Sequence, residues 1–300
     1  MIRSITVTNH LGESLELVLA DPDSSGLAIT KITGIGEPDA DINITEMAGS
    51  DFGAFNSARY TKRNVVLSIK YWGDDIEASR IKCNKYFPTK KMIKLRFVTD
   101  YRDCYLSGYV EKNDPDIFSK ASSCQISIVC PDRYFYSEDL ITTDFSHLEP
   151  RFFFPFCDGN EDEIEFGELI VEKEKSLYYE GDGETGLTIE LHALGIVKGF
   201  VLYNSNTNEQ IGIDDTALAT ITGSGIVERD TIVINTRKGQ KSVVLVRDGI
   251  TTNIINALIK NPRPSWFELS AGDNVLAYTA TEGEYDLILN MYHRNTYKGI

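Results

Sequence analysis

The chain has 300 residues, of which 42% are hydrophobic and 25% charged, and its formal net charge is −15 at pH 7. A chain of this length and composition can bury a substantial core in one large or two medium domains, which excludes a wholly disordered protein. An acidic protein repels phosphate polymers unless its cations cluster, so the charge argues against sequence-specific DNA binding.

The N-terminal residues 1–10, MIRSITVTNH, alternate in polarity without the apolar run of a secretory signal. No stretch of the sequence approaches the roughly 18 consecutive apolar residues that a membrane helix needs. We therefore expect a protein that does not insert into membranes.

Strands with one buried face are predicted along the first half of the chain, because apolar and polar residues alternate there with period two. The clearest segments are residues 4–20, 63–72, 93–99 and 123–130. One helix is predicted in residues 73–88, which begin with acidic residues and end at Pro88. Its expected buried stripe is Ile76, Arg80, Cys83 and Phe87. The first half is thus predicted to be a small β-barrel or sandwich with one packed helix.

The composition changes near residue 148. Residues 148–166, LEPRFFFPFCDGNEDEIEF, are first aromatic and proline-bearing and then acidic, which is typical of a linker entering a new domain. We therefore expect two domains, residues 1–147 and residues 148–300. The aromatic run would form a sticky patch in water, and we expect it to pack at the domain junction or against another subunit. Its members are Phe152, Phe153, Phe154 and Phe156.

Short strands separated by turns are predicted in the rest of the chain. The Lys238–Gly239 and Asp248–Gly249 steps are typical of hairpins or turns, and a short helix is predicted in residues 253–260, before Pro262. Many short strands with little helix indicate an antiparallel sandwich or jelly roll. The predicted fold class is therefore mainly β.

Motifs that could bind a nucleotide or calcium are weak. Residues 181–186, GDGETG, have the spacing of a dinucleotide-binding loop, but a strand-like segment follows them and their acidic side chains would repel phosphate. A β-turn is the preferred interpretation. Residues 158–168 begin like an EF-hand loop, but Glu163 stands where that loop needs glycine. A solvated acidic loop is therefore preferred over a loose calcium site.

The histidines and cysteines show no catalytic or metal-binding spacing. The four histidines are scattered, and no CxxC pair or zinc-like Cys/His spacing is present. The five cysteines are predicted to be reduced and mostly buried: Cys83, Cys104, Cys124, Cys130 and Cys157. We expect no enzyme activity, no cofactor and no metal site.

Residues 49–64, GSDFGAFNSARYTKRN, place two phenylalanines, a tyrosine and three cations just before an apolar strand. Basic and aromatic residues interleave in this way in sites that bind single-stranded nucleic acid. A single basic cluster in so acidic a chain favours a different interpretation, an exposed arm that pairs with acidic groups on a protein surface.

This stretch resembles a segment of the distal tail proteins of long non-contractile-tailed bacteriophages. In that family a glycine-bearing turn and a basic residue precede a strand, and a helix follows. The matching residues here are Asp51, Gly53, Ala54 and Arg63, before a strand that begins at Val65 and a helix from about Asp75.

Three later segments extend the resemblance in the same order. Residues 92–112 resemble the strand pair after the helix, and residues 130–139 resemble the aromatic motif that closes the first domain, with Arg133 where relatives tend to have proline. Residues 265–300 resemble the C-terminal pattern, which is carried here by Leu269, Gly272, Asn274, Tyr297 and Gly299.

The resemblance implies a structural hub at the tip of a phage tail. Such proteins form a homo-hexameric ring that joins the tail tube protein to baseplate and receptor-binding proteins, and DNA passes through the ring. The first domain would close the ring with an extended β-hairpin arm at about residues 40–64, and the second would be a galectin-like sandwich. The protein would be made in the bacterial host cytoplasm and reside in the virion tail tip.

Within the arm, glycines allow the hairpin to turn, and the resemblance implies contacts with the adjoining copy. We expect the aromatic side chains to anchor the arm and the cationic ones to pair with the neighbour's carboxylates: Phe52, Phe55, Arg59, Lys62 and Arg63. Because each arm meets a different patch on the next subunit, assembly would be heterologous and closed by rotation. The acidic balance would suit a lumen that does not hold DNA.

A carbohydrate-binding β-sandwich for host-surface adhesion is the main alternative, with Trp266 or clustered tyrosines stacked on sugar rings. It predicts a monomer with glycan affinity and leaves the first domain unexplained. An enzyme such as a glycoside hydrolase is a further alternative, for which the sequence offers no identifiable residues.

Overall fold

The computed structural model describes residues 1–46, 49, 51–116, 122–150 and 167–300. The chain divides into two compact units, Met1–Asp139 with Thr296–Ile300, and Leu140–Asn295. This division lies at residue 140, whereas the sequence suggested residue 148, and it assigns the last five residues to the first unit. Strands dominate both units, which confirms the predicted mainly-β class.

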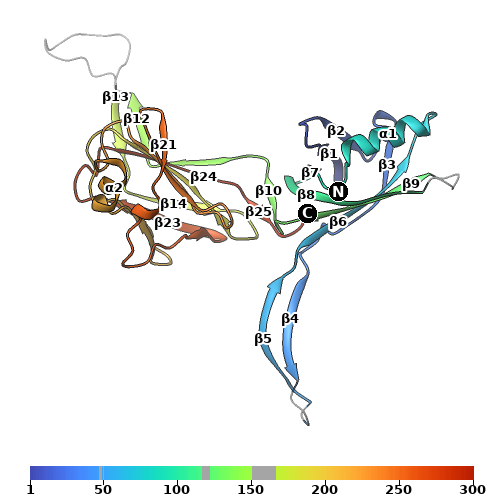
Figure 1. The fold of residues 1–300 in the computed structure, drawn as a ribbon, viewed down its shortest axis with the longest axis horizontal. Coiled ribbons are helices and arrows are strands. Elements are labelled where there is room, and N and C mark those ends of the chain that lie inside the picture. Colours follow the sequence, from blue (N-terminus) through green and yellow to red (C-terminus); the bar gives the residue numbers. More distant parts are fainter. Residues whose placement is uncertain (47–48, 50, 117–121, 151–166) are drawn as a thin grey trace. The chain divides into compact units, whose positions relative to one another are not determined.

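The first unit is built on a nine-stranded antiparallel sheet with the order β2-β1-β7-β8-β9-β6-β3, in which β10 pairs with both β8 and β25 (Figure 1). Its strands are β1 (Ile2–Thr8), β2 (Ser14–Val18), β3 (Leu27–Thr33), β6 (Arg63–Tyr71), β7 (Met92–Thr99), β8 (Asp103–Asp116), β9 (Ser123–Cys130), β10 (Phe135–Ser137) and β25 (Thr296–Tyr297). A short 3-10 helix, η1 (Pro22–Ser24), lies between β2 and β3.

The predicted alternation explains the core of this unit. Inward residues such as Val7, Leu67 and Leu95 are fully buried, while their neighbours in sequence are more exposed. The helix α1 (Ile76–Tyr86) begins where the Asp75 carboxylate accepts a hydrogen bond from the Ala78 backbone N–H. The predicted helix is confirmed.

The buried stripe of α1 differs from the prediction in part. Cys83 and Phe87 belong to the core, as expected, but Ile76 is 38% exposed and Ser79 is buried in its place. The small Ser79 side chain lets the helix approach the turn at Trp72, whose carbonyl oxygen accepts its hydroxyl at 3.0 Å.

Two further strands of the first unit leave the sheet altogether. The strands β4 (Ala40–Glu46) and β5 (Gly53–Tyr60) pair only with each other and extend away from the nine-stranded sheet as a hairpin (Figure 1). The extended arm that the sequence predicted at about residues 40–64 is therefore present, and we call residues 40–60 the arm.

The second unit contains two main antiparallel sheets, with the orders β11-β24-β16-β19-β20-β21 and β14-β23-β17-β18. Two small pairs, β12-β13 and β15-β22, accompany them. The strands are β11 (Ile141–Asp144), β12 (Ser146–Pro150), β13 (Gly167–Val171), β14 (Glu174–Tyr179), β15 (Thr185–Gly186), β16 (Thr188–Ala193), β17 (Val201–Asn204), β18 (Glu209–Gly212), β19 (Thr231–Asn235), β20 (Ser242–Arg247), β21 (Ile250–Asn253), β22 (Glu268–Leu269), β23 (Gly272–Thr279) and β24 (Leu287–His293).

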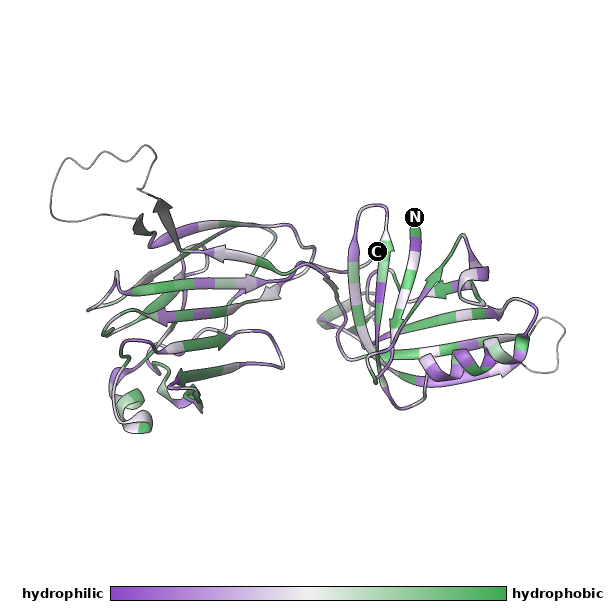
Figure 2. Ribbon diagram, turned by 90° about the horizontal axis from the view of Figure 1, so that it is seen from above, coloured by the Kyte–Doolittle hydropathy of each residue, from purple (hydrophilic) through white to green (hydrophobic). Residues whose placement is uncertain are grey.

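Buried residues of both sheets form one core, as in a β-sandwich. Leu202 and Leu276 come from the four-stranded sheet, and Ile189, Ile234 and Leu289 come from the six-stranded one. Hydrophobic and hydrophilic residues alternate along these strands, as Figure 2 shows. This alternation is what buries one face of each sheet and leaves the other in water.

The turn between β20 and β21 confirms its prediction. Asp248 and Gly249 have φ angles of 51° and 76°, so both central residues adopt the left-handed conformation that a two-residue type I′ hairpin requires. The helix predicted in residues 253–260 is shorter than expected, because only the 3-10 turn η2 (Ile255–Ala257) forms there.

An unpredicted helix, α2 (Asp215–Thr222), lies between β18 and β19. Asp214 caps its start by accepting hydrogen bonds from two backbone N–H groups, and Gly223 ends it with a φ of 85°. The aromatic run, the acidic segment 158–166 and Cys157 lie outside the described residues.

Candidate functional site

The arm has one apolar and one polar face. Ile42 lies opposite Ala58, and Ile44 lies opposite Phe55, so these four side chains share one face of the two-stranded ribbon. Asp41 lies opposite Arg59 on the other face, where their side chains form an ion pair at 3.0 Å.

A β-bulge keeps these faces in phase. The pairing register shifts between Asn43 and Ile44, so that β5 carries one extra residue, Asn56. Without this shift Phe55 would turn to the polar face, because a one-residue slip reverses every side chain beyond it. The Asn56 amide points to the polar face, where it donates a hydrogen bond to the Thr45 hydroxyl at 2.5 Å.

The apolar face of the arm is largely open to solvent. Ile42 is 57% exposed, Ile44 55% and Phe55 67%, and Phe52, just before the start of β5, is 82% exposed. Exposed apolar side chains that form a contiguous patch are typical of surfaces that bind another molecule. A two-stranded hairpin is also marginally stable in water by itself. The arm therefore has the chemistry of a segment that a partner covers.

The base of the arm is anchored by aromatic and cationic side chains. The rings of Tyr60 and Tyr134 meet edge to face, with centroids 6.5 Å apart, and the Arg133 guanidinium lies 5.7 Å from the Tyr60 ring. Arg133 therefore packs on the last residue of the arm.

Arg63 does not occupy the exposed position that the sequence suggested. Its side chain is 4% exposed at the start of β6, and burial lowers the pKa of its guanidinium. The group still carries its charge. It donates hydrogen bonds of 2.6 to 2.8 Å to four backbone carbonyl oxygens, those of Gly34, Gly36, Arg133 and Lys298. A guanidinium bound in this way within its own chain is not free to pair with a neighbour's carboxylates.

The other predicted contact residues lie on or next to the arm. Phe52 and Phe55 lie at its outer end, Arg59 is on the polar face, and Lys62 is exposed beside the base. Four of the five residues are thus accessible, whereas Arg63 belongs to the base. The contact residues predicted from the sequence did not include Ile42 and Ile44, although a spacing of two residues places both on one face of a strand.

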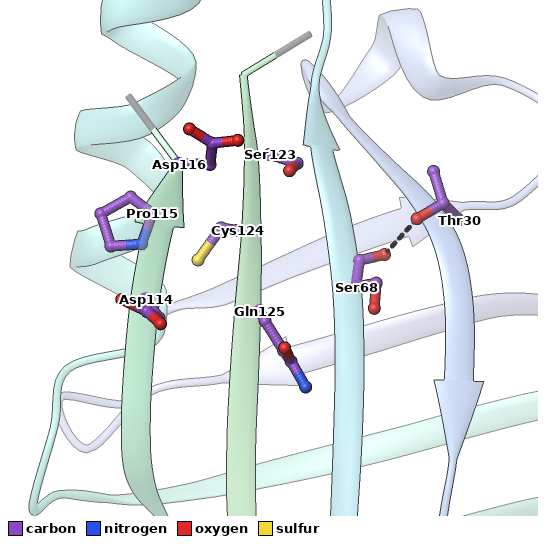
Figure 3. Close-up of a pocket in the computed structure, with 8 residues that line it drawn as sticks. All are labelled: Thr30, Ser68, Asp114, Pro115, Asp116, Ser123, Cys124 and Gln125. Carbon is purple, nitrogen blue, oxygen red and sulfur yellow. Dashed lines mark hydrogen bonds between the residues drawn. The ribbon is translucent and has the colours of Figure 1, made fainter. Parts of the chain in front are cut away.

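A shallow polar hollow of about 340 Å³ lies elsewhere on the first unit, across the ends of β8 and β9 and the adjoining strands (Figure 3). Thr30 donates a hydrogen bond across it to the Ser68 backbone oxygen at 3.0 Å. Its remaining lining residues are Asp114, Pro115, Asp116, Ser123, Cys124 and Gln125. These residues do not form a catalytic set, so the hollow gives no indication of function.

Metal and thiol chemistry receive no support from the described part of the chain. No group of three or more histidine, cysteine or acidic residues there is arranged to hold a metal ion. The four described cysteines are free and buried, and burial raises the pKa of Cys104 and Cys130 to about 12. A thiol with such a pKa is a poor nucleophile near neutral pH.

One predicted feature of the second unit can also be located. Trp266, the candidate sugar platform, packs in part against the core, and the Lys241 ammonium lies 5.5 Å from its ring centroid.

None of the helices in the described ranges is long and apolar enough to cross a membrane.

Comparison with solved structures places the fold. The crystal structure of the Dit protein of phage SPP1, described as a hub adsorption apparatus of phages that infect Gram-positive bacteria, matches with a TM-score of 0.65 and 13% identity. The match covers 97% of this chain and 98% of that one. The chain has the fold of a phage hub protein.

Two structures of the phage P2 baseplate in its activated conformation agree with this assignment. The structure with calcium matches with a TM-score of 0.54 and 12% identity, and the one with strontium with 0.52 and 11%. Each match covers 100% of both chains. No protein-family model matches the chain, and no curated protein matches its sequence. The resemblance to distal tail proteins is therefore confirmed at the level of fold.

Proposed function

We propose that the protein is the structural hub of a bacteriophage tail tip, where six copies form a ring. The observation that carries this proposal is the arm, a projecting hairpin with Ile42, Ile44 and Phe55 exposed on one face. A match to hub and baseplate chains along the whole length supports the tail-tip location.

The arm suits assembly of a ring from identical copies. The arm projects away from the nine-stranded sheet, so the arm of one copy would reach a different patch on the next copy. Contacts of this heterologous kind close into a ring when the rotation between copies fits. The ring would join the tail tube protein to baseplate and receptor-binding proteins, in a virion assembled in the bacterial cytoplasm, without enzymatic activity.

The charge distribution refines the expectation about DNA. The first unit has 18 Lys and Arg against 20 Asp and Glu, whereas the second has 12 against 25. The acidity of the chain therefore belongs mainly to the second unit. A ring lined by the first unit would be close to neutral, which offers DNA few cations from which to release counterions. DNA would therefore pass through the lumen because the wall of the ring binds it weakly, and not because that wall is acidic.

One pair of substitutions tests the role of the arm in assembly. Ile44→Asp places a charge on the apolar face, and Ser57→Asp places the same charge on the exposed polar face. Because both positions are accessible in the single chain, neither change should lower its melting temperature by more than about 2 °C. Ile44→Asp should abolish ring formation, since the neighbour would bury an unpaired carboxylate.

Ring formation is measured by light scattering and negative-stain images of the chain, with its tail tube partner co-expressed. Six-fold rings that Ser57→Asp keeps and Ile44→Asp loses would support the proposal. Rings that survive Ile44→Asp would show that the arm does not hold neighbouring copies together. A wild-type chain that stays monomeric with its partner present would contradict the hub function itself.

A further inference from the structure

The base of the arm is held by a segment from the far end of the sequence. Strand β25 pairs with β10, and beyond it the Ile300 backbone N–H donates to the Ile35 carbonyl oxygen at 3.1 Å. Residues 34–36 lead directly toward β4. We call residues 296–300 the clasp, and residues 34–39 with 61–63 the arm base.

The Arg63 side chain joins the clasp to the arm base by hydrogen bonds. Two of its four hydrogen bonds end on Gly34 and Gly36 in the arm base, at 2.6 and 2.7 Å, and one ends on Lys298 in the clasp, at 2.6 Å. The fourth ends on Arg133. The guanidinium carbon also lies 4.6 Å from the centroid of the Phe135 ring. One side chain therefore ties the arm base to the clasp and to Arg133 before β10.

Close backbone packing accompanies these bonds. A Cβ atom on Gly299 would lie 3.0 Å from the carbonyl carbon of Gly36, so any side chain at this position would push the clasp and the arm base apart by a few tenths of an ångström. Arg102 holds the clasp from the other side, with its Nη1 donating to the Gly299 oxygen at 2.7 Å and its guanidinium 4.3 Å from the Tyr297 ring centroid.

We propose that the clasp and Arg63 set the direction of the arm, and that Arg63 is the positioning residue of the assembly surface. All four of its hydrogen bonds end on backbone carbonyl oxygens, in the arm base, in the clasp and at Arg133. Opening the clasp removes one carbonyl from Arg63 and frees the Ile35 carbonyl, which loosens residues 34–36 and the start of β4. The importance of this device for ring assembly rests on the proposed hub function.

Hydrogen exchange on the full-length single chain tests the proposal without depending on the ring. Arg63→Gln removes the fork of donors, and Gly299→Val forces the clasp away from residue 36 without touching Arg63. In both variants the amide hydrogens of the arm base should exchange at least about tenfold faster than in the wild type. One of these amides is that of Thr61, which donates to the Asp39 carbonyl oxygen at 2.8 Å. Exchange in β1 and β7 should stay unchanged.

Arg96→Gln is the matched control. Arg96 belongs to the same sheet, and its guanidinium pairs with the Asp103 carboxylate at 2.5 Å. This variant should leave exchange at the arm base as it is in the wild type. The proposal is overturned if Gly299→Val leaves the arm base unchanged, or if both variants accelerate exchange evenly through the first unit, as a general loss of stability would. If wild-type chains never form rings, only the hub function fails, and the exchange result still decides the role of the clasp.

Discussion

At the scale of single residues, His293 is the clearest titratable group without a partner. Its side chain is 3% exposed in β24, and neither ring nitrogen has a hydrogen-bond partner among the described residues. Its ring and that of Tyr179 meet in a T-shaped arrangement, with centroids 5.8 Å apart. Burial lowers the pKa of His293 to about 4, because a charged imidazole would lose its hydration there.

This burial predicts that acid weakens the second unit. The unfolded chain binds a proton at His293 near pH 6.5 and the folded chain only near pH 4, so the free energy of unfolding should fall as the pH drops between these values. The loss should reach at most about 3 kcal/mol. Urea unfolding of the second unit from pH 7.5 to 4 measures it. His293→Leu should flatten this pH dependence, and equal slopes in variant and wild type would refute the assignment.

At the scale of elements, the arm shows how a single extra residue controls a surface. Deleting Asn56 should give a regular ladder in which Ile44 still lies opposite Phe55, so the apolar face survives and rings still form. Deleting Asn43 instead should turn Ile44 to the polar face and prevent assembly. Both deletions remove one asparagine from the arm. Light scattering of the two variants checks the expectation, and equal assembly would contradict the assigned faces.

The same scale shows what the sequence could predict. The helix α1 was recognisable because charge at its start and Pro88 at its end agree with the dipole and with chain geometry. The helix α2 was missed because its eight residues include three threonines and an isoleucine, which favour strands, although Asp214 and Gly223 mark its two ends. In a sequence, a helix this short is recognised by its capping residues rather than by the periodicity of its apolar residues.

The position of Arg63 was predictable in principle. It lies two residues before Val65 on the inward face of β6, but its nearness in sequence to Arg59 and Lys62 suggested an exposed cationic cluster. The carbonyl oxygens that satisfy it come from residues up to 235 positions away in the sequence, as Lys298 shows. Neither this pairing nor the bulge at Asn56 follows from local pattern, because both depend on which strands meet in the folded chain.

At the scale of the whole molecule, the two units have separate hydrophobic cores. In the second unit, Asp230 is 1% exposed and accepts two hydrogen bonds from Arg247, at 2.7 and 2.5 Å. Arg247 also donates to the Ser224 hydroxyl and the Gly225 carbonyl oxygen, both at 2.7 Å. The pair therefore fixes the loop after α2 to β20 within one core.

Removing the carboxylate should report on that core alone. Asp230→Ala leaves the Arg247 charge half-enclosed without its partner, which should cost about 3 kcal/mol and lower the melting temperature of the second unit by about 10 °C. Calorimetry of the single chain should show two transitions, of which only one moves, because the first unit shares none of these contacts. Arg96→Gln should shift the other transition slightly, since its ion pair lies at the surface of the first unit. A single transition that Asp230→Ala shifts as a whole would mean that the two cores unfold as one cooperative structure.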